Sequence, residues 1–185
     1  SLQRCLQSLL KITSYPHYEI ILVDNQSTAE EMLVYLEQLQ RDKEIRVLRL
    51  EREENLATIN NLAVPQAKGR VLLFLNDDTE IIQPDWLQEL LGHVLRSDVG
   101  MVGPRLLGAD HRLLQSGLIL GMGTIGIAGQ INQGLWHDEW GYLGRNQATQ
   151  NCSALSEACL MITKSLYQTV GGMDETMRLF NEVDF

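Results

Sequence analysis

Residues 70–79 have the sequence RVLLFLNDDT, and this stretch is the clearest indication of the fold class. A continuous run of aliphatic and aromatic residues is typical of a strand buried on both faces, and the polar residues that follow end it. Gly69 ends the helical pattern before this run, and Pro84 suits the first turn of the helical pattern after it. A buried strand between two helices predicts a sheet that is covered by helices on both faces.

The alternation of strands and helices continues on both sides of this stretch. Apolar periodicity predicts strands at 19–24, 45–50, 70–75 and 99–102, and helices at 2–10, 29–40, 55–67 and 84–95. Strands that alternate with helices are joined by right-handed crossovers, which make neighbouring strands parallel. We therefore expect an α/β fold with a mostly parallel sheet.

The pattern changes after residue 103. Glycines recur from 108 to 144, which predicts a hairpin followed by a long loop carrying Trp136, Trp140 and Tyr142. Loops longer than about 12 to 15 residues are usually functional or disordered, so this loop is a candidate lid. A strand at 154–163, a short helix at 165–170 and a glycine turn at 171–175 follow.

Length and charge restrict the class of protein. The chain has 185 residues with 15 Lys and Arg against 24 Asp and Glu, a formal charge of -9. An acidic domain of this size buries a core of its own but offers no basic surface for nucleic acid. The three cysteines lack metal-ligand spacing, and no apolar stretch reaches the roughly 18 residues of a membrane span. These features favour a cytoplasmic domain with free thiols.

Carboxylates follow two of the expected strands, where ligands bind in open parallel sheets. Asp24 ends the 19–24 strand, and Asp77 and Asp78 follow the 70–75 strand. Adjacent carboxylates repel each other, and a divalent cation would relieve that repulsion by taking both as ligands. Two acidic residues in a turn could equally cap the next element. A third acidic group, Glu182 with Asp184, could supply a general base.

The ordered set of motifs resembles the family 2 glycosyltransferases, inverting enzymes with the GT-A fold. The motifs are YPHYEIILVDNQST at 15–28, INNLA at 59–63 with AKG at 67–69, FLNDDT at 74–79 with PDWL at 84–87, ACLMI at 158–162 with VGGMDE at 170–175, and NEVDF at 181–185. They span nearly the whole chain, so the resemblance implies a Rossmann-like GT-A sheet with a glycine-rich acceptor-side region.

The resemblance also implies a role for individual residues. A nucleotide-sugar donor would lie against Asp24, Asn25, Ser27, Asn60 and Asp77, with Asp24 on the base or ribose. Asp78, with Asp77, would hold Mn²⁺ or Mg²⁺ on the diphosphate. Glu182 falls where the family usually has its catalytic Asp, and Asp184 is the other candidate for the base.

The implied protein is a single glycosyltransferase domain over 1–185, with a nucleotide-sugar-binding part at 1–102 and an acceptor-side part at 103–185. By resemblance it begins after the family's first strand and ends before the family's C-terminal region. The donor would be UDP-, GDP- or dTDP-linked, and the acceptor a glycan or lipid-linked molecule of bacterial surface polysaccharide synthesis. Peripheral membrane association, at the inner face of the membrane, would come from regions outside the chain.

Two other functions remain open at this point. A domain of the same fold could bind glycans or a protein partner without turnover, which Glu182 in place of Asp and Glu157 in place of a common Gly suggest. A sugar nucleotidyltransferase would have a similar sheet of alternating strands and helices. It would also need a basic, glycine-rich loop after its first strand, a region that the sequence does not contain.

Overall fold

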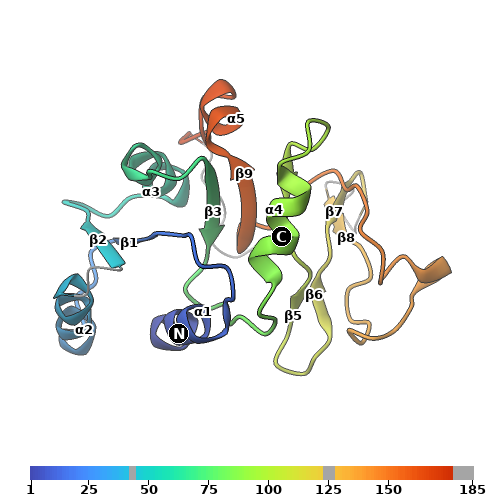
Figure 1. Cartoon of the computed structure of the whole chain (residues 1–185), viewed down its shortest axis with the longest axis horizontal. Helices are drawn as coiled ribbons and strands as arrows, with labels where there is room; N and C mark the ends of the chain where they lie inside the picture. The colour runs from blue at the N-terminus through green and yellow to red at the C-terminus, as the bar shows by residue number, and fades with distance from the viewer. Residues whose placement is uncertain (42–44, 123–127, 177–185) are drawn as a thin grey trace. The chain divides into compact units, whose positions relative to one another are not determined.

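The computed structural model of the chain describes residues 1–41, 45–122 and 128–176 (Figure 1). Contacts divide these residues into two compact units. The first unit contains Ser1–Ser14 and Leu73–Ile162, and the second contains Tyr15–Leu72 and the described residues from Thr163 onward. Among the described helices, none combines the length and the apolar character needed to cross a bilayer.

The second unit is built on a parallel strand pair. Strand β1 (Ile20–Asp24) pairs in parallel with β2 (Ile45–Arg49), and helix α2 (Glu30–Arg41) makes the crossover between them. The helix packs against β2 and buries Leu36 (Figure 1). This register aligns Asp24 with Arg49 at the carboxyl ends of the two strands.

Side-chain caps begin the α-helices α3 and α5 of the second unit. Helix α3 (Leu56–Ala63) begins after Asn55, whose side chain accepts a hydrogen bond from the Thr58 amide at 2.9 Å. The expected helix at 55–67 divides here, because Pro65 has no N–H to continue the α-helical bonds, and the 3₁₀ turn η1 (Val64–Gln66) follows α3. Helix α5 (Lys164–Thr169) is capped by the Thr163 side chain.

Two helices of the first unit carry apolar stripes at helical spacing. Helix α1 (Leu2–Ile12) buries Leu2, Cys5, Leu6 and Leu9, as the i, i+3, i+4, i+7 pattern predicts. Helix α4 (Trp86–Val94) buries Leu87, Leu90 and Val94. The indole N–H of Trp86 donates to the Thr13 hydroxyl at 2.9 Å, which ties the start of α4 to the end of α1.

The sheet of the first unit has the strand order β3-β9-β4, formed by β3 (Val71–Leu75), β9 (Cys159–Thr163) and β4 (Met101–Val102). Strand β4 is antiparallel to β9, and both are shorter than the strands expected at 99–102 and 154–163. Ala154 instead bridges to Leu118 outside the sheet.

The glycine-rich region forms two hairpins and a 3₁₀ turn. Strands β5 (Leu106–Leu107) and β6 (Leu113–Gln115) are antiparallel, as are β7 (Leu118–Leu120) and β8 (Ala128–Gln130), and η2 spans Tyr142–Gly144. Short connections allow only antiparallel neighbours, whereas parallel pairing needs a crossover such as α2. The pair β1 with β2 is parallel, and the pairs β4 with β9, β5 with β6 and β7 with β8 are antiparallel.

Candidate functional site

The acidic turn predicted after β3 is present in the first unit. Asp77 and Asp78 are both exposed and occupy a turn that the backbone closes from the Thr79 amide to the Asn76 carbonyl, at 3.3 Å. The Thr79 hydroxyl donates to the same carbonyl at 2.7 Å. Asp77 Oδ2 accepts a hydrogen bond from the Ser1 hydroxyl at 2.9 Å. The turn therefore presents two adjacent carboxylates to solvent from a hydrogen-bonded base.

Two carboxylates can supply only part of the ligand set of a divalent cation, and the other ligands would be phosphate oxygens and water. Within the described ranges, no group of three or more His, Cys, Asp or Glu side chains could enclose a metal. Mg²⁺ is commonly held by one or two carboxylates together with phosphate oxygens and water. Asp77 and Asp78 supply such a partial ligand set, so the residues present fit a metal that arrives with a diphosphate.

Cys5 packs behind the acidic turn. Its thiol donates to the Asn76 carbonyl with an Sγ–O distance of 3.7 Å. Burial raises the pKa of Cys5, the Thr79 hydroxyl opposes that shift, and the nearby carboxylates of Asp77 and Asp78 add to it. The Cys5 side chain is therefore a protonated donor at neutral pH.

Asp24 is a buried carboxylate of the second unit. Its Oδ1 accepts a hydrogen bond from the Ser27 amide at 2.9 Å. Its Oδ2 lies 3.4 Å from Arg49 Nε, an ion-pair distance, but accepts no hydrogen bond from the described residues. Arg49 also donates from Nη2 to the Ser27 carbonyl at 3.2 Å. One carboxylate oxygen is therefore left for a donor group of a ligand.

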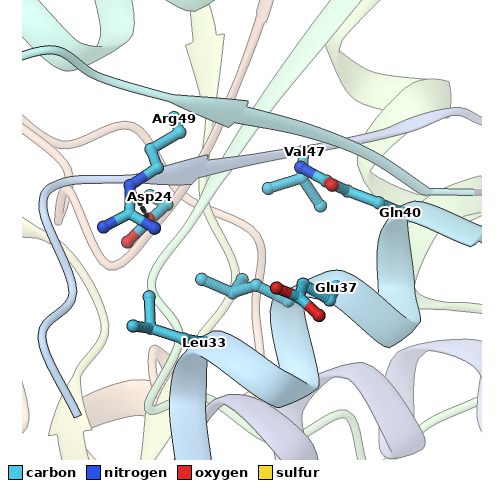
Figure 2. Close-up of a pocket in the computed structure, with 7 residues that line it drawn as sticks. Asp24, Leu33, Glu37, Gln40, Val47 and Arg49 are labelled. Carbon is cyan, nitrogen blue, oxygen red and sulfur yellow. Dashed lines mark ion pairs between the residues drawn. The ribbon is translucent and has the colours of Figure 1, made fainter. Parts of the chain in front are cut away.

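A pocket of about 280 Å³ adjoins Asp24 and Arg49. Figure 2 shows their ion pair on one side and the α2 side chains Glu37 and Gln40 on another. Leu33, Leu36 and Val47 provide apolar lining. A mixed lining of this kind suits a small, partly polar group.

The polar turn after Asp24 is held by its own side chains. Asn25 donates from Nδ2 to the Glu54 carbonyl at 3.0 Å and accepts from the Glu54 amide at 2.9 Å. Gln26 has a φ of 64° and its side chain contacts the Leu50 carbonyl. The Asn25 amide thus joins this turn to the segment after β2, while the Ser27 backbone supports Asp24.

Asn60 and Asn61 lie on α3 and bind the glycine turn near residue 173. Asn60 donates from Nδ2 to the Met173 sulfur at 3.3 Å. Asn61 accepts from the Met173 amide at 3.0 Å and from the Tyr167 hydroxyl at 2.6 Å, and donates to the Met173 carbonyl at 2.9 Å. Asn60 was predicted as a site residue, but its neighbour Asn61, which was not predicted, makes more of the contacts.

The loop with the aromatic residues is organised around Asn146. This buried side chain donates to the carbonyls of Trp136 and Glu139, at 3.3 and 2.6 Å. Arg105 donates from Nη1 to the backbone carbonyl of Asn146 at 2.8 Å. Trp140 and Tyr142 are 74% and 76% exposed. The loop therefore holds two aromatic side chains in solvent.

The predicted residues fall into separate groups. Asp24, Asn25, Ser27 and Asn60 belong to the second unit, and Asp77 and Asp78 belong to the first. Arg49 was not predicted as a site residue, because its position opposite Asp24 depends on the register of β1 with β2. Glu182 and Asp184, the predicted candidates for the base, lie outside the described residues.

Comparisons with known proteins identify the family of the chain. The sequence matches the family described as Glycosyl transferase family 2 over residues 1–171. It is 37% identical to the uncharacterized protein y4gI of Sinorhizobium fredii over 95% of the chain, and 35% identical to the O-antigen biosynthesis protein RfbC of Myxococcus xanthus over 96%. The chain spans only 19% and 14% of those two proteins.

The fold is shared with solved glycosyltransferase structures. A crystal structure of GalNAc-T7 with UDP, GalNAc and Mn²⁺ superposes with a TM-score of 0.70 at 18% identity, covering 100% of this chain and 36% of that one. At this identity the likeness concerns the fold, and it confirms the predicted GT-A class. The match over residues 1–171 confirms the predicted family: the chain belongs to glycosyltransferase family 2.

Proposed function

We propose that the chain forms the donor-binding and catalytic domain of a metal-dependent, inverting glycosyltransferase. It would move a sugar from a UDP-, GDP- or dTDP-linked donor to a glycan or lipid-linked acceptor in bacterial surface polysaccharide synthesis, on the cytoplasmic side of the membrane. The observation that carries the proposal is the exposed pair Asp77 and Asp78 at the end of β3. The O-antigen biosynthesis relative in Myxococcus xanthus supports the proposed pathway.

Asp24 and its neighbours would bind the nucleoside. The unsatisfied Asp24 Oδ2 is an acceptor for an N–H of the base or a ribose hydroxyl. The Ser27 amide and Arg49 hold the carboxylate in place, so the acceptor is oriented before the donor binds. Asn25 fixes the surrounding turn, and Asn60 would contribute from α3.

Asp77 and Asp78 would hold Mn²⁺ or Mg²⁺ together with the diphosphate of the donor. The bound cation would neutralise charge on the departing nucleoside diphosphate. Their exposure leaves room for phosphate oxygens in the remaining ligand positions. The GalNAc-T7 structure with UDP and Mn²⁺ has the same fold and supports this part of the proposal.

The carboxylate of Glu182 or Asp184 would act as the base. It would take the proton of the acceptor hydroxyl while that oxygen forms a bond to the anomeric carbon. The bond from the anomeric carbon to the diphosphate oxygen breaks on the opposite face, so the configuration inverts. Turnover by Glu182→Gln and Asp184→Asn variants of the full-length protein would tell which carboxylate accepts the proton.

Calorimetry with UDP, GDP and dTDP, with and without Mn²⁺, tests the donor site. We expect one nucleotide to bind more tightly with Mn²⁺, and Asp78→Ala to abolish the increment due to the metal. Asp98→Ala is the matched control, because Asp98 is an exposed carboxylate of the same unit that pairs with Arg96. No metal-dependent binding of any of the three nucleotides would refute the proposal.

A further inference from the structure

One side of α1 carries small polar side chains that face the acidic turn. Ser1, the N-cap of α1, is followed by Cys5 and Ser8 within the helix. The spacings of four and three residues place these side chains on one helical stripe. We call Ser1, Cys5 and Ser8 the polar stripe of α1.

The polar stripe contacts the turn at successive points along its length. Ser1 donates to the Asp77 carboxylate at 2.9 Å. Cys5 Sγ lies 3.7 Å from the Asn76 carbonyl oxygen, to which it donates, and 3.9 Å from the Thr79 hydroxyl. Further along, the Ser8 hydroxyl accepts a hydrogen bond from the Ile81 amide at 2.9 Å. The segment 76–81 is therefore fixed by one helix face.

The hydrogen bond from the Ile81 amide to Ser8 is the contact of segment 76–81 that water can least readily replace. The Ile81 residue is only 8% exposed, so its amide would have little access to water if the Ser8 oxygen were removed. A buried donor without a partner is more costly than a lost hydrogen bond in solvent. Ser8 is itself oriented, because its hydroxyl donates to the Cys5 carbonyl at 2.9 Å.

Strand β9 fixes the other end of the same segment. The Asn76 amide donates to the Ala158 carbonyl at 3.0 Å, next to the first residue of β9. Asp77 and Asp78 thus lie between one anchor on β9 and one on α1. Without the Ser8 contact, the C-terminal end of the segment 76–81 would lose its hydrogen bond to α1.

We propose that the polar stripe of α1 sets the metal affinity of the acidic turn, with Ser8 as the positioning residue. The inference rests on the proposed function, since it takes Asp77 and Asp78 as the metal ligands. Carboxylates held in place before the cation arrives lose less conformational freedom on binding, and a loosened turn binds the cation more weakly. Ser8 has no contact with the cation in this scheme and acts through the backbone of the turn.

The stability of α1 is a separate property. Leu2, Leu6 and Leu9 provide apolar burial for the helix, and they are unchanged in variants of the polar stripe. Alanine has a higher helix propensity than serine, so Ser8→Ala tends to stabilise the helix itself. A loss of metal affinity in this variant would therefore not come from a poorly formed α1.

The test measures Mn²⁺ binding by the full-length protein, with the free ion followed by electron paramagnetic resonance in the presence of saturating UDP or GDP. The variants are Ser8→Ala, Ser8→Thr, which keeps the hydroxyl, and Gln7→Ala, an exposed control on the same helix. Nucleotide affinity without metal and the thermal midpoint are measured in parallel. Asp78→Ala reports whether the metal site is the acidic turn.

We expect Ser8→Ala to weaken Mn²⁺ binding about threefold to tenfold, the equivalent of one hydrogen bond, with metal-free nucleotide affinity unchanged. Ser8→Thr should restore most of the affinity, and Gln7→Ala should match the wild type. Equal Mn²⁺ affinity in Ser8→Ala and wild type, or an equal loss in Ser8→Ala and Ser8→Thr, overturns the inference.

The outcomes separate this inference from the proposed function. If Asp78→Ala abolishes Mn²⁺ binding and Ser8→Ala leaves it unchanged, the metal site stands and the positioning role of Ser8 is wrong. If the wild type binds no Mn²⁺ with any nucleotide, both are wrong.

Discussion

The ion pair between Asp24 and Arg49 is expected to stabilise the fold, and its geometry gives an estimate of the coupling free energy. The Asp24 side chain is 1% exposed, the Arg49 side chain is 49% exposed, and Nε and Oδ2 are 3.4 Å apart. At that distance two unit charges attract by about 5 kcal/mol at an effective dielectric constant of 20, and by about 1 kcal/mol in water. Because half of Arg49 is in solvent, we expect a coupling of about 1 to 3 kcal/mol.

A double-mutant cycle measures this coupling. Arg49→Met keeps the aliphatic stem but removes the charge, and Asp24→Asn removes the charge of its partner. Arg49→Met alone leaves a buried carboxylate supported by the Ser27 amide, so it should lower the free energy of unfolding more than it does in the Asp24→Asn background. Urea denaturation of the wild type, both single variants and the double variant gives the four free energies.

Additive effects of the two substitutions would contradict this prediction. If the two substitutions add to within about 0.5 kcal/mol, the Asp24 carboxylate does not depend on Arg49. The pair formed by Arg96 and Asp98 is the control, because both side chains are more than half exposed. A smaller coupling is expected for it, because water screens two exposed charges.

Two further predictions concern close packing and a buried thiol. In urea denaturation, Gly172→Ala should lower the free energy of unfolding more than Gly171→Ala. Both glycines have positive φ, of 82° and 87°, but a Cβ at 172 would lie 2.5 Å from Asn61 Oδ1, whereas one at 171 would meet nothing within 4 Å. We expect losses of about 3 and 1 kcal/mol, and equal losses would contradict a close contact at 172. Burial raises the pKa of Cys159 to about 12, so above the ordinary thiol pKa of about 8.5 the unfolded state loses its proton first and stability falls as pH rises toward 12. Between pH 8 and 10.5 the free energy of unfolding of the wild type should fall by about 2 kcal/mol more than that of Cys159→Val. An equal fall in both proteins would show that the Cys159 thiol does not cause the pH dependence.

Local sequence signals predicted most of the elements well. The leucine spacing of α1, the aliphatic runs of β1 and β3 and the position of Asp24 at a strand end are all decided by neighbouring residues. Errors arose at boundaries. Pro65 divides the helix expected at 55–67, and the strand expected from 154 begins at Cys159 because Ala154 pairs with Leu118.

The contacts that hold the candidate site were beyond sequence reasoning, because they join distant segments. Ser8 meets Ile81 across 73 residues, and Asn61 meets Met173 across 112. No periodicity reports such pairs. The Arg49 contact depends on the register of β1 with β2, and a shift of one residue would have turned its side chain to the other face.

The two acidic groups achieve orientation by different means, and this difference predicts different behaviour toward ligands. The Asp24 carboxylate is desolvated when the chain folds, and its ion pair with Arg49 and its hydrogen bond from the Ser27 amide compensate for that loss. A ligand donor therefore meets an acceptor that has already lost its water. Asp77 and Asp78 remain in water and are oriented through the backbone that α1 holds from behind. A ligand donor of the right shape at Asp24 gains a hydrogen bond to the buried Oδ2, which a ligand of the wrong shape does not make, whereas the exposed turn exchanges one hydrated cation for another at little cost. We therefore expect selectivity among nucleotides to depend on Asp24 with its partners Arg49 and Ser27, and Mn²⁺ and Mg²⁺ to substitute for each other at the acidic turn.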